Sequence, residues 1–163
     1  DQVVPGEVIE SLAPILIHRR EYRQDSGGPG QFRGGLGQTM EVSVRTGQPY
    51  TFSSLCDRLH HPAAGYAGGE PGELARIELS DGRTIGAKGA LELDPDTRVT
   101  LNLPGGGGYF SPLERDPEAV LDDVVDGLVS IDAARMKYGV VIDPETLSID
   151  HDSTAQLRIS RMS

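Results

Sequence analysis

Pro104-Gly105-Gly106-Gly107-Gly108-Tyr109 is the stretch on which the rest of the chain depends. Four consecutive glycines bring no side chain to a core, and glycine loses more conformational freedom on folding than any other residue. Such a run is kept where main chain turns tightly or approaches something closely. We favour a tight turn against which other backbone packs. The alternative is a nest of N–H groups that holds an anion or a carboxylate.

A second glycine cluster runs from residue 25 to residue 37, with the sequence Asp-Ser-Gly-Gly-Pro-Gly-Gln-Phe-Arg-Gly-Gly-Leu-Gly. Each cluster has an arginine nearby: Arg33 lies within this one, and Arg115 follows the four-glycine run. A guanidinium group can clamp a carboxylate or a phosphate through its planar fork of donors. The alternative, which we favour, is that Asp25 and Arg33 stabilise the loop itself.

The composition limits the class of protein. A chain of 163 residues suits one domain of ordinary size. A formal net charge of −10 argues against nucleic acid or an anionic membrane as the main partner. No apolar run approaches the roughly 20 residues of a membrane span, and no signal peptide opens the sequence. The single cysteine, Cys56, favours a reducing compartment, the cytoplasm. Because residue 1 is Asp1, we expect a processed or truncated product.

Most of the first 103 residues has strand character. Met40, Val42 and Val44 alternate with polar residues, which is typical of a half-buried strand. We expect strands over 14–23, 39–45, 50–55, 74–79, 91–93 and 98–103, a return over 84–87, and an antiparallel hairpin of 39–45 with 50–55. The segment 3–11 leads into the first strand, and Ile9 and Leu12 suggest docking on an apolar surface.

The last third predicts short helices. Asp116-Pro117-Glu118 has the residues of a helix start, and Ser130 can cap a second helix over 131–138. We expect a short buried strand at 140–142, a last helix over 153–159, and a solvated helix face carrying Asp122, Asp123 and Asp126. The predicted class is α+β, mainly antiparallel, in one domain that is β-rich over 1–103 and helical over 116–163.

The familiar catalytic and nucleotide-binding patterns are missing from the sequence. Neither glycine cluster is followed by Gly-Lys-Ser/Thr, and no Gly-x-Gly-x-x-Gly joins a strand to a helix. His60 and His61 are adjacent to each other and lack the spacing of metal ligands. Ser26 and Cys56 have no visible partner base, and no Gly-x-Ser-x-Gly occurs.

Several motifs in the same order resemble the hydantoinase B / 5-oxoprolinase family, which includes the large subunits of acetone and acetophenone carboxylases. The matching stretches are 25–37, 58–72, the glycine run with Pro112-Leu113-Glu114-Arg115-Asp116-Pro117-Glu118, Asp123-Val124 with Gly127, Ala133-Ala134-Arg135, and Tyr138-Gly139-Val140-Val141. Two positions depart from the family pattern. Leu103 stands where threonine is expected, and Phe110 stands where glycine is expected.

The resemblance implies that this chain is the C-terminal part of a longer subunit. That subunit works with a hydantoinase A-type partner, fused or separate, which carries ATP with Mg. Together such proteins open cyclic amides such as 5-oxoproline or hydantoins, or carboxylate ketones. ATP would phosphorylate the amide or enol oxygen, which creates a leaving group. Any family metal lies upstream, and the resemblance assigns no metal ligand or catalytic residue to this chain.

Three functions follow from the resemblance. The leading one is a domain of an ATP-dependent cyclic-amide hydrolase, inactive alone, that shapes the active site or the subunit interface. The others are part of a ketone carboxylase and a purely structural assembly domain. The residues expected at the substrate or the interface are the glycines and their polar neighbours, namely Asp25, Ser26, Arg33, Gly34, Gly35, Arg58, Gly105, Gly106, Gly107, Gly108 and Arg115.

Overall fold

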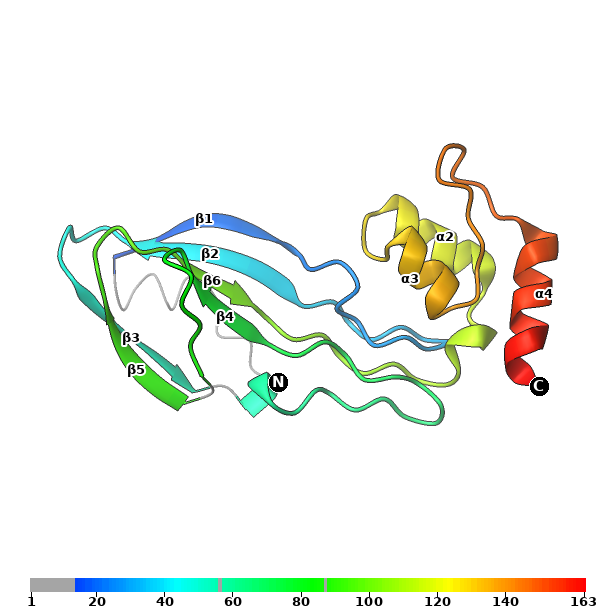
Figure 1. Ribbon diagram of the computed structural model, residues 1–163, viewed down its shortest axis with the longest axis horizontal. Coiled ribbons are helices and arrows are strands. Elements are labelled where there is room, and N and C mark those ends of the chain that lie inside the picture. The colour runs from blue at the N-terminus through cyan, green and yellow to red at the C-terminus, as the bar shows by residue number, and fades with distance from the viewer. Residues whose placement is uncertain (1–13, 56, 87) are drawn as a thin grey trace.

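The protein has two lobes joined by extended chain. The computed structural model describes residues 14–55, 57–86 and 88–163, so the leading segment 3–11, Cys56 and Ala87 lie outside the described residues. Strands gather at one end of the molecule and helices at the other, with long segments running side by side between them (Figure 1). This arrangement confirms the predicted α+β class, with antiparallel sheets first and short helices last.

The larger sheet has four antiparallel strands in the order β1-β2-β6-β4. They are β1 (Ile15–Tyr22), β2 (Gln38–Val44), β6 (Val99–Asn102) and β4 (Arg76–Leu79). The pairing places Ile17 opposite Val42, and Val42 opposite Val99. Four of the predicted strands are thereby confirmed, and each is bounded by glycine- or proline-containing turns.

The second sheet pairs β3 (Tyr50–Leu55) with β5 (Lys88–Leu93). The predicted hairpin of 39–45 with 50–55 is therefore wrong. Both edges of β2 are already paired, one with β1 and the other with β6, so β3 leaves the sheet and finds its partner in β5. The return predicted over 84–87 is reduced to a single bridge between Thr84 and Glu78.

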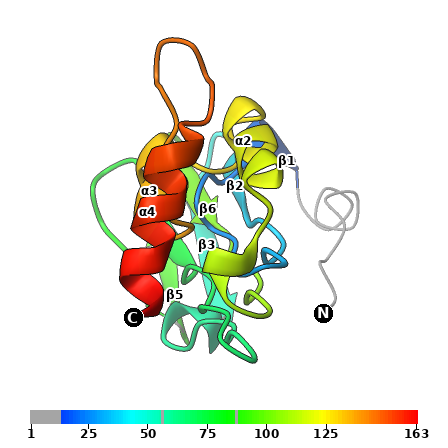
Figure 2. The same cartoon turned by 90° about the vertical axis from the view of Figure 1, so that its right-hand side faces the viewer.

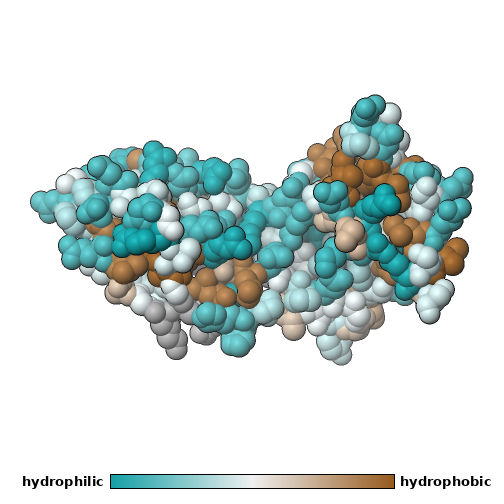
Figure 3. Space-filling view, viewed as in Figure 1, coloured by the Kyte–Doolittle hydropathy of each residue, from teal (hydrophilic) through white to brown (hydrophobic). Residues whose placement is uncertain are grey.

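The two sheets share one apolar core. Its buried members lie on β4, β5 and β6 and in the loop after β4, namely Ile77, Leu79, Ile85, Leu93 and Val99. A single-turn 3₁₀ helix, η1 (Asp57–Leu59), follows β3. Figure 3 shows exposed apolar residues on both lobes, whereas the middle of the molecule is polar or neutral.

The helical lobe begins with a 3₁₀ turn, η2 (Pro112–Glu114), and contains α2 (Pro117–Val125), α3 (Ile131–Met136) and α4 (His151–Met162). The predicted caps are confirmed: Asp116 accepts from the Glu118 N–H, and Ser130 accepts from the Ala133 N–H. The last helix begins earlier than predicted because the Asp150 side chain caps it, and it runs on to residue 162. Instead of a strand, 140–142 contributes one bridge, between residues 142 and 149.

The helical lobe has its own core. Figure 2, seen from this end, shows the three helices gathered over the ends of the extended segments. The buried side chains come from α2, α3 and the chain after each, namely Val120, Val129, Ala134, Tyr138, Val140 and Ile142. Among the described residues, no helix combines the length and apolar character that crossing a bilayer requires.

Candidate functional site

Three extended segments, 26–37, 63–73 and 103–109, form what we call the glycine neck between the lobes (Figure 1). Hydrogen bonds between main-chain groups hold them together. The Gly28 N–H donates to the Gly106 carbonyl at 2.8 Å, and the Gly106 N–H donates to the Gly35 carbonyl at 2.8 Å. The Gly108 N–H donates to the Glu70 carbonyl at 2.9 Å, so residue 108 joins the neck's second segment to its third.

Glycine is required in the neck for space. A Cβ at Gly34 would overlap the Gly106 carbonyl oxygen, and a Cβ at Gly105 would overlap the Ser26 carbonyl oxygen. None of the neck's tightest glycines has a positive φ, so left-handed backbone is not the reason for them. The four-glycine run is packed against other main chain, as the favoured interpretation expects.

The alternative interpretation of the run, an anion nest, needs free N–H groups. The N–H groups of Gly105, Gly106 and Gly108 already donate to the carbonyls of residues 73, 35 and 70. A phosphate or carboxylate would have to break these bonds, and a buried carbonyl that loses its donor costs about 1–3 kcal/mol. The chemistry of the run is therefore that of a packed interior.

A buried carboxylate links the neck to the helical lobe. Asp123 of α2 is only 7% exposed, and its carboxylate accepts hydrogen bonds from Arg33 and Arg115. Arg33 donates through Nε to Oδ2 at 3.0 Å and through Nη2 to Oδ1 at 3.2 Å, and Arg115 donates through Nη2 to Oδ2 at 2.9 Å. The prediction of a solvated face is therefore wrong for Asp123.

Each arginine in turn holds main chain of the neck. Arg33 Nη1 donates to the Gly34 carbonyl at 2.9 Å, and Arg115 Nη1 donates to the Gln31 carbonyl at 3.0 Å. A buried carboxylate is stable only where cations and hydrogen bonds compensate the loss of water. The cluster of Arg33, Arg115 and Asp123, which we call the arginine clasp, therefore fixes α2 to the first neck segment.

The remaining predicted residues lie apart from the clasp. Asp25 does not pair with Arg33: it has a φ of +61° and accepts the Ser130 N–H at 2.7 Å, which ties the neck to the start of α3. Ser26 is fully buried, and its hydroxyl accepts from the Gly37 N–H at 2.8 Å. Arg58 is exposed in η1, and within the described residues no bond to its side chain is found.

Sequence reasoning overlooked Arg23, just after β1. Its Nη1 donates to the carbonyls of Leu74 at 2.6 Å and Leu103 at 3.2 Å, where two neck segments leave the sheet. Burial lowers the pKa of Arg23, an effect that Glu73 partly opposes. No motif in the sequence identifies this residue.

A pocket of 240 Å³ lies where the neck meets α3. Asp25, Glu70 and Lys137 line it, and Lys137 Nζ lies 2.8 Å from a Glu70 carboxylate oxygen. Tyr138 also lines the pocket, and burial raises the pKa of this tyrosine to about 12, while the nearby guanidinium groups oppose the rise. The tyrosine is thus a neutral group next to the clasp at ordinary pH.

Four aromatic rings cluster at the end of the neck beside η2, where they form what we call the aromatic tip. Tyr66 stacks on Tyr109 with centroids 5.3 Å apart, Tyr109 meets Phe110 edge-on at 4.1 Å, and Phe32 lies 6.4 Å from Phe110. All four are exposed, Tyr66 by 67% and Phe32 by 59%. Phe110 has a φ of +61°, a conformation that costs a non-glycine residue about 1–2 kcal/mol.

The described residues contain no evident metal centre. Among residues 14–55, 57–86 and 88–163, no group of three or more His, Cys, Asp or Glu side chains is placed to hold a metal. The ionic groups of the clasp pair with one another, and the large apolar side chains that the neck exposes are those of the aromatic tip.

Comparison with known proteins identifies relatives of the chain. The family described as Hydantoinase B/oxoprolinase matches residues 2–112. The chain is similar to the caprolactamase subunit beta of Pseudomonas jessenii, with 40% identity over 148 residues, which is 84% of this chain and 25% of the relative. It is also similar to 5-oxoprolinase 1 of Arabidopsis thaliana, with 34% identity over 109 residues, which is 64% of this chain and 8% of that protein.

Two solved structures are also similar to the chain. The ATP-dependent caprolactamase of Pseudomonas jessenii matches with a TM-score of 0.78 and 36% identity over 94% of this chain and 28% of that chain. Nucleotide-free acetone carboxylase matches with a TM-score of 0.74 and 22% identity, over 99% of this chain and 26% of that chain. At this identity the similarity shows the fold alone. The chain thus spans about a quarter of the length of the caprolactamase subunit.

Two adjacent glycines test whether space is what the neck requires. We expect Gly34→Ala to lower the free energy of unfolding by about 2–3 kcal/mol, because the new methyl group meets a backbone oxygen that cannot move aside. Gly35→Ala should leave it unchanged or raise it by up to about 1 kcal/mol, since nothing lies within 4 Å of a Cβ there. Urea denaturation measures both, and equal losses would contradict the account.

Asp123→Asn tests the arginine clasp. The substitution leaves two partly buried guanidinium groups facing a neutral amide, so we expect the free energy of unfolding to fall by about 3 kcal/mol. Asp122→Asn, the neighbouring exposed carboxylate on the same helix, should change it by less than about 0.5 kcal/mol. A similar effect of both substitutions on the thermal midpoint would show that the clasp adds nothing.

Proposed function

Because the chain belongs to the hydantoinase B/oxoprolinase family, we propose that it is the C-terminal part of a subunit of an ATP-dependent enzyme that opens cyclic amides. The similarity to a caprolactamase subunit and to a 5-oxoprolinase supports this reaction class, since both names denote enzymes acting on a ring amide. The substrate is then a small lactam, oxoproline or hydantoin. The compartment we propose is the cytoplasm, where a lone cysteine stays reduced.

Within that enzyme, the proposed role of this domain is to hold the aromatic tip against the rest of the assembly. The observation that carries the proposal is Phe110. Its ring is 37% exposed, and its backbone has a φ of +61°, which is uncommon for a residue other than glycine. Strain retained at an exposed site supports a role in contact, and aromatic rings are the side chains most enriched in interfaces.

The proposed neighbours of the tip are the upstream part of the same subunit and a hydantoinase A-like subunit or domain. We place ATP and its Mg on that partner. The glycine run does not fit a nucleotide phosphate, because the N–H groups of Gly105, Gly106 and Gly108 already donate to carbonyls. This chain's own residues supply positioning: the clasp and the neck fix where the tip stands relative to the two lobes.

The same fold occurs in acetone carboxylase, so a ketone is the alternative substrate class. Turnover separates the alternatives. The enzyme assembled from the full-length subunit and its partner should hydrolyse ATP in the presence of caprolactam or 5-oxoproline, and acetone with bicarbonate should not stimulate it. The 163-residue chain alone should turn over none of them, because it spans only about a quarter of the caprolactamase subunit to which it is similar. Turnover by the isolated chain would contradict the proposal that this domain only positions other parts of the enzyme.

A matched pair of tyrosines tests the aromatic tip in the full assembly. Tyr66 and Tyr22 are equally exposed, at 67% and 66%, but Tyr22 lies on β1 away from the tip. We expect Tyr66→Ala to weaken assembly or lower kcat/KM about tenfold, as for a contact residue worth about 1.4 kcal/mol. Tyr22→Ala should stay within about twofold of the unaltered enzyme.

Phe110→Gly separates interface from fold. Relief of the positive φ and loss of the ring contacts offset each other, so the stability of this chain should change by less than about 1 kcal/mol. Activity of the assembly should nevertheless fall. Full activity in both tip variants would contradict the proposed role.

A further inference from the structure

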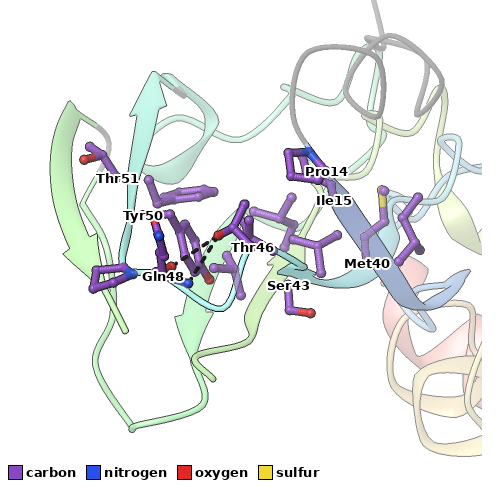
Figure 4. A pocket seen from close by; sticks show the side chains of 15 residues that line it. Pro14, Ile15, Met40, Ser43, Thr46, Gln48, Tyr50 and Thr51 are labelled. Atoms are coloured by element: carbon purple, nitrogen blue, oxygen red, sulfur yellow. Dashed lines mark hydrogen bonds between the residues drawn. The ribbon is translucent and has the colours of Figure 1, made fainter. Parts of the chain in front are cut away.

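The protein has pockets of two kinds. In the β lobe, a pocket of 460 Å³ opens between the four-stranded sheet and β3, with Pro14, Ile15 and Met40 on one side and Tyr50 on the other (Figure 4). Its walls are almost entirely aliphatic or aromatic and continue the core of that lobe. The pocket of 240 Å³ beside α3, which we call the neck pocket, instead brings polar and charged side chains together.

Hydrogen-bond acceptors dominate the charged lining of the neck pocket. The charged side chains that line it are Asp25, Glu70, Glu73 and Lys137. Lys137 Nζ pairs with one oxygen of Glu70 at 2.8 Å, and one oxygen of Asp25 accepts the N–H at the start of α3. Glu73 is 60% exposed and lies 3.9 Å from Nη2 of Arg23. Three carboxylates against one ammonium group give the lining a formal charge of −2.

A tyrosine hydroxyl without a partner reaches the same pocket. Tyr138 lines the pocket although it is only 2% exposed. Within the described part of the chain, no hydrogen bond to its hydroxyl is found, yet the one fully enclosed side-chain polar atom without a partner there is Nε of Arg115. The Tyr138 hydroxyl therefore meets solvent space, and the pocket is where the residue does so. Because buried hydroxyls are normally hydrogen-bonded, this one calls for a polar group inside the pocket.

The rest of the lining suits a small apolar body. Its apolar side chains are those of Pro29, Pro71, Val129 and Ala133. The volume of 240 Å³ equals about eight water molecules, since each takes about 30 Å³ in the liquid. A molecule of a few carbon atoms therefore fits beside the charged groups.

We propose that the neck pocket binds a small organic ammonium ion. An ammonium group brings a positive charge and three N–H donors. These match the net charge of the lining and the remaining carboxylate oxygens of Asp25 and Glu73. The Tyr138 hydroxyl oxygen accepts from the same group, and the short carbon chain packs on Val129 and Ala133. The same carboxylates repel an anionic ligand.

The proposed reaction supplies a ligand of this class. Opening a lactam ring frees an amino group, so the ring-opened product carries the ammonium ion that the neck pocket fits. This identification of a natural ligand rests on the proposed function, whereas the ammonium site itself rests only on the residues that line the pocket.

Three probes with one four-carbon skeleton and different charges test the site. Butylammonium, butyramide and butyrate are titrated into the 163-residue chain at neutral pH and about 0.15 M ionic strength. The readout is the NMR shift of the amides of Gly27, Gly72 and Lys137, which line the pocket. We expect saturable shifts with butylammonium, binding of butyramide at least about tenfold weaker, and no shifts with butyrate.

The proposal is overturned if butylammonium gives no saturable shifts at these amides, or if butyramide or butyrate binds as tightly. Neither result changes the expected turnover of cyclic amides by the full assembly. A failure of the ammonium site is therefore distinguishable from a failure of the proposed function.

Two conservative variants test the groups that hold the ion. Tyr138→Phe removes only the hydroxyl, and we expect it to weaken butylammonium binding about fivefold. Asp25→Asn removes one charge but keeps an oxygen for the Ser130 N–H and a residue type that tolerates a positive φ, and we expect about tenfold weaker binding.

Asp122→Asn is the matched control, because it makes the same change of charge at an exposed residue of α2 outside the pocket. It should bind butylammonium as the unaltered chain does. An equal loss in all three variants would show that the overall negative charge of the protein attracts the ion, which contradicts the proposal. Unchanged binding in both Tyr138→Phe and Asp25→Asn would contradict it as well.

Discussion

Contact between main chain and main chain, with no side chain between, is the constraint on which this protein depends. In an ordinary domain, layers of side chains separate the elements, and burial of those side chains stabilises the fold. In the neck, carbonyl oxygens lie where Cβ atoms would otherwise stand, at Gly34 and at Gly105 among others. Stability there comes from hydrogen bonds that satisfy backbone donors and acceptors away from water.

Such a neck joins two lobes whose cores are separate. Polar side chains connect each lobe to it: Arg23 holds the two segments that leave the sheet, and the clasp around Asp123 holds α2. Because a buried charge without its partners is strongly unfavourable, the clasp favours one placement of the helices over all others. That placement sets the position of the aromatic tip, whose four rings are exposed.

The local elements were predictable from the sequence because their signals are local. The alternation of apolar and polar residues over 39–45 predicted the strand β2, and Asp116 and Ser130 cap helices as predicted. The hairpin of β2 with β3 was not predictable, because strand partners depend on which edges the rest of the sheet leaves free. The spacing of apolar residues in the sequence does not show which strands compete for the same edge.

The sequence identified several residues of the site but not the partners that they contact. The glycines and Arg33 stood out as unusual, but the partner of Arg33 lies 90 residues away, on a helix face that looked acidic and solvated. One signal was present: Asp123 follows the buried Val120 by three residues, which places both on the same side of α2. The aromatic tip gave no signal, since its rings come from three separate segments.

Native-state hydrogen exchange of the neck amides tests the central claim most directly. If packed main chain holds the lobes together, the N–H groups of Gly28, Gly106 and Gly108 should exchange only through global unfolding, with protection close to the full free energy of unfolding. Gly47 and Gly86, which have open space around them, should exchange rapidly. Neck amides that exchange as fast as those two, in a chain whose strands stay protected, would contradict the account.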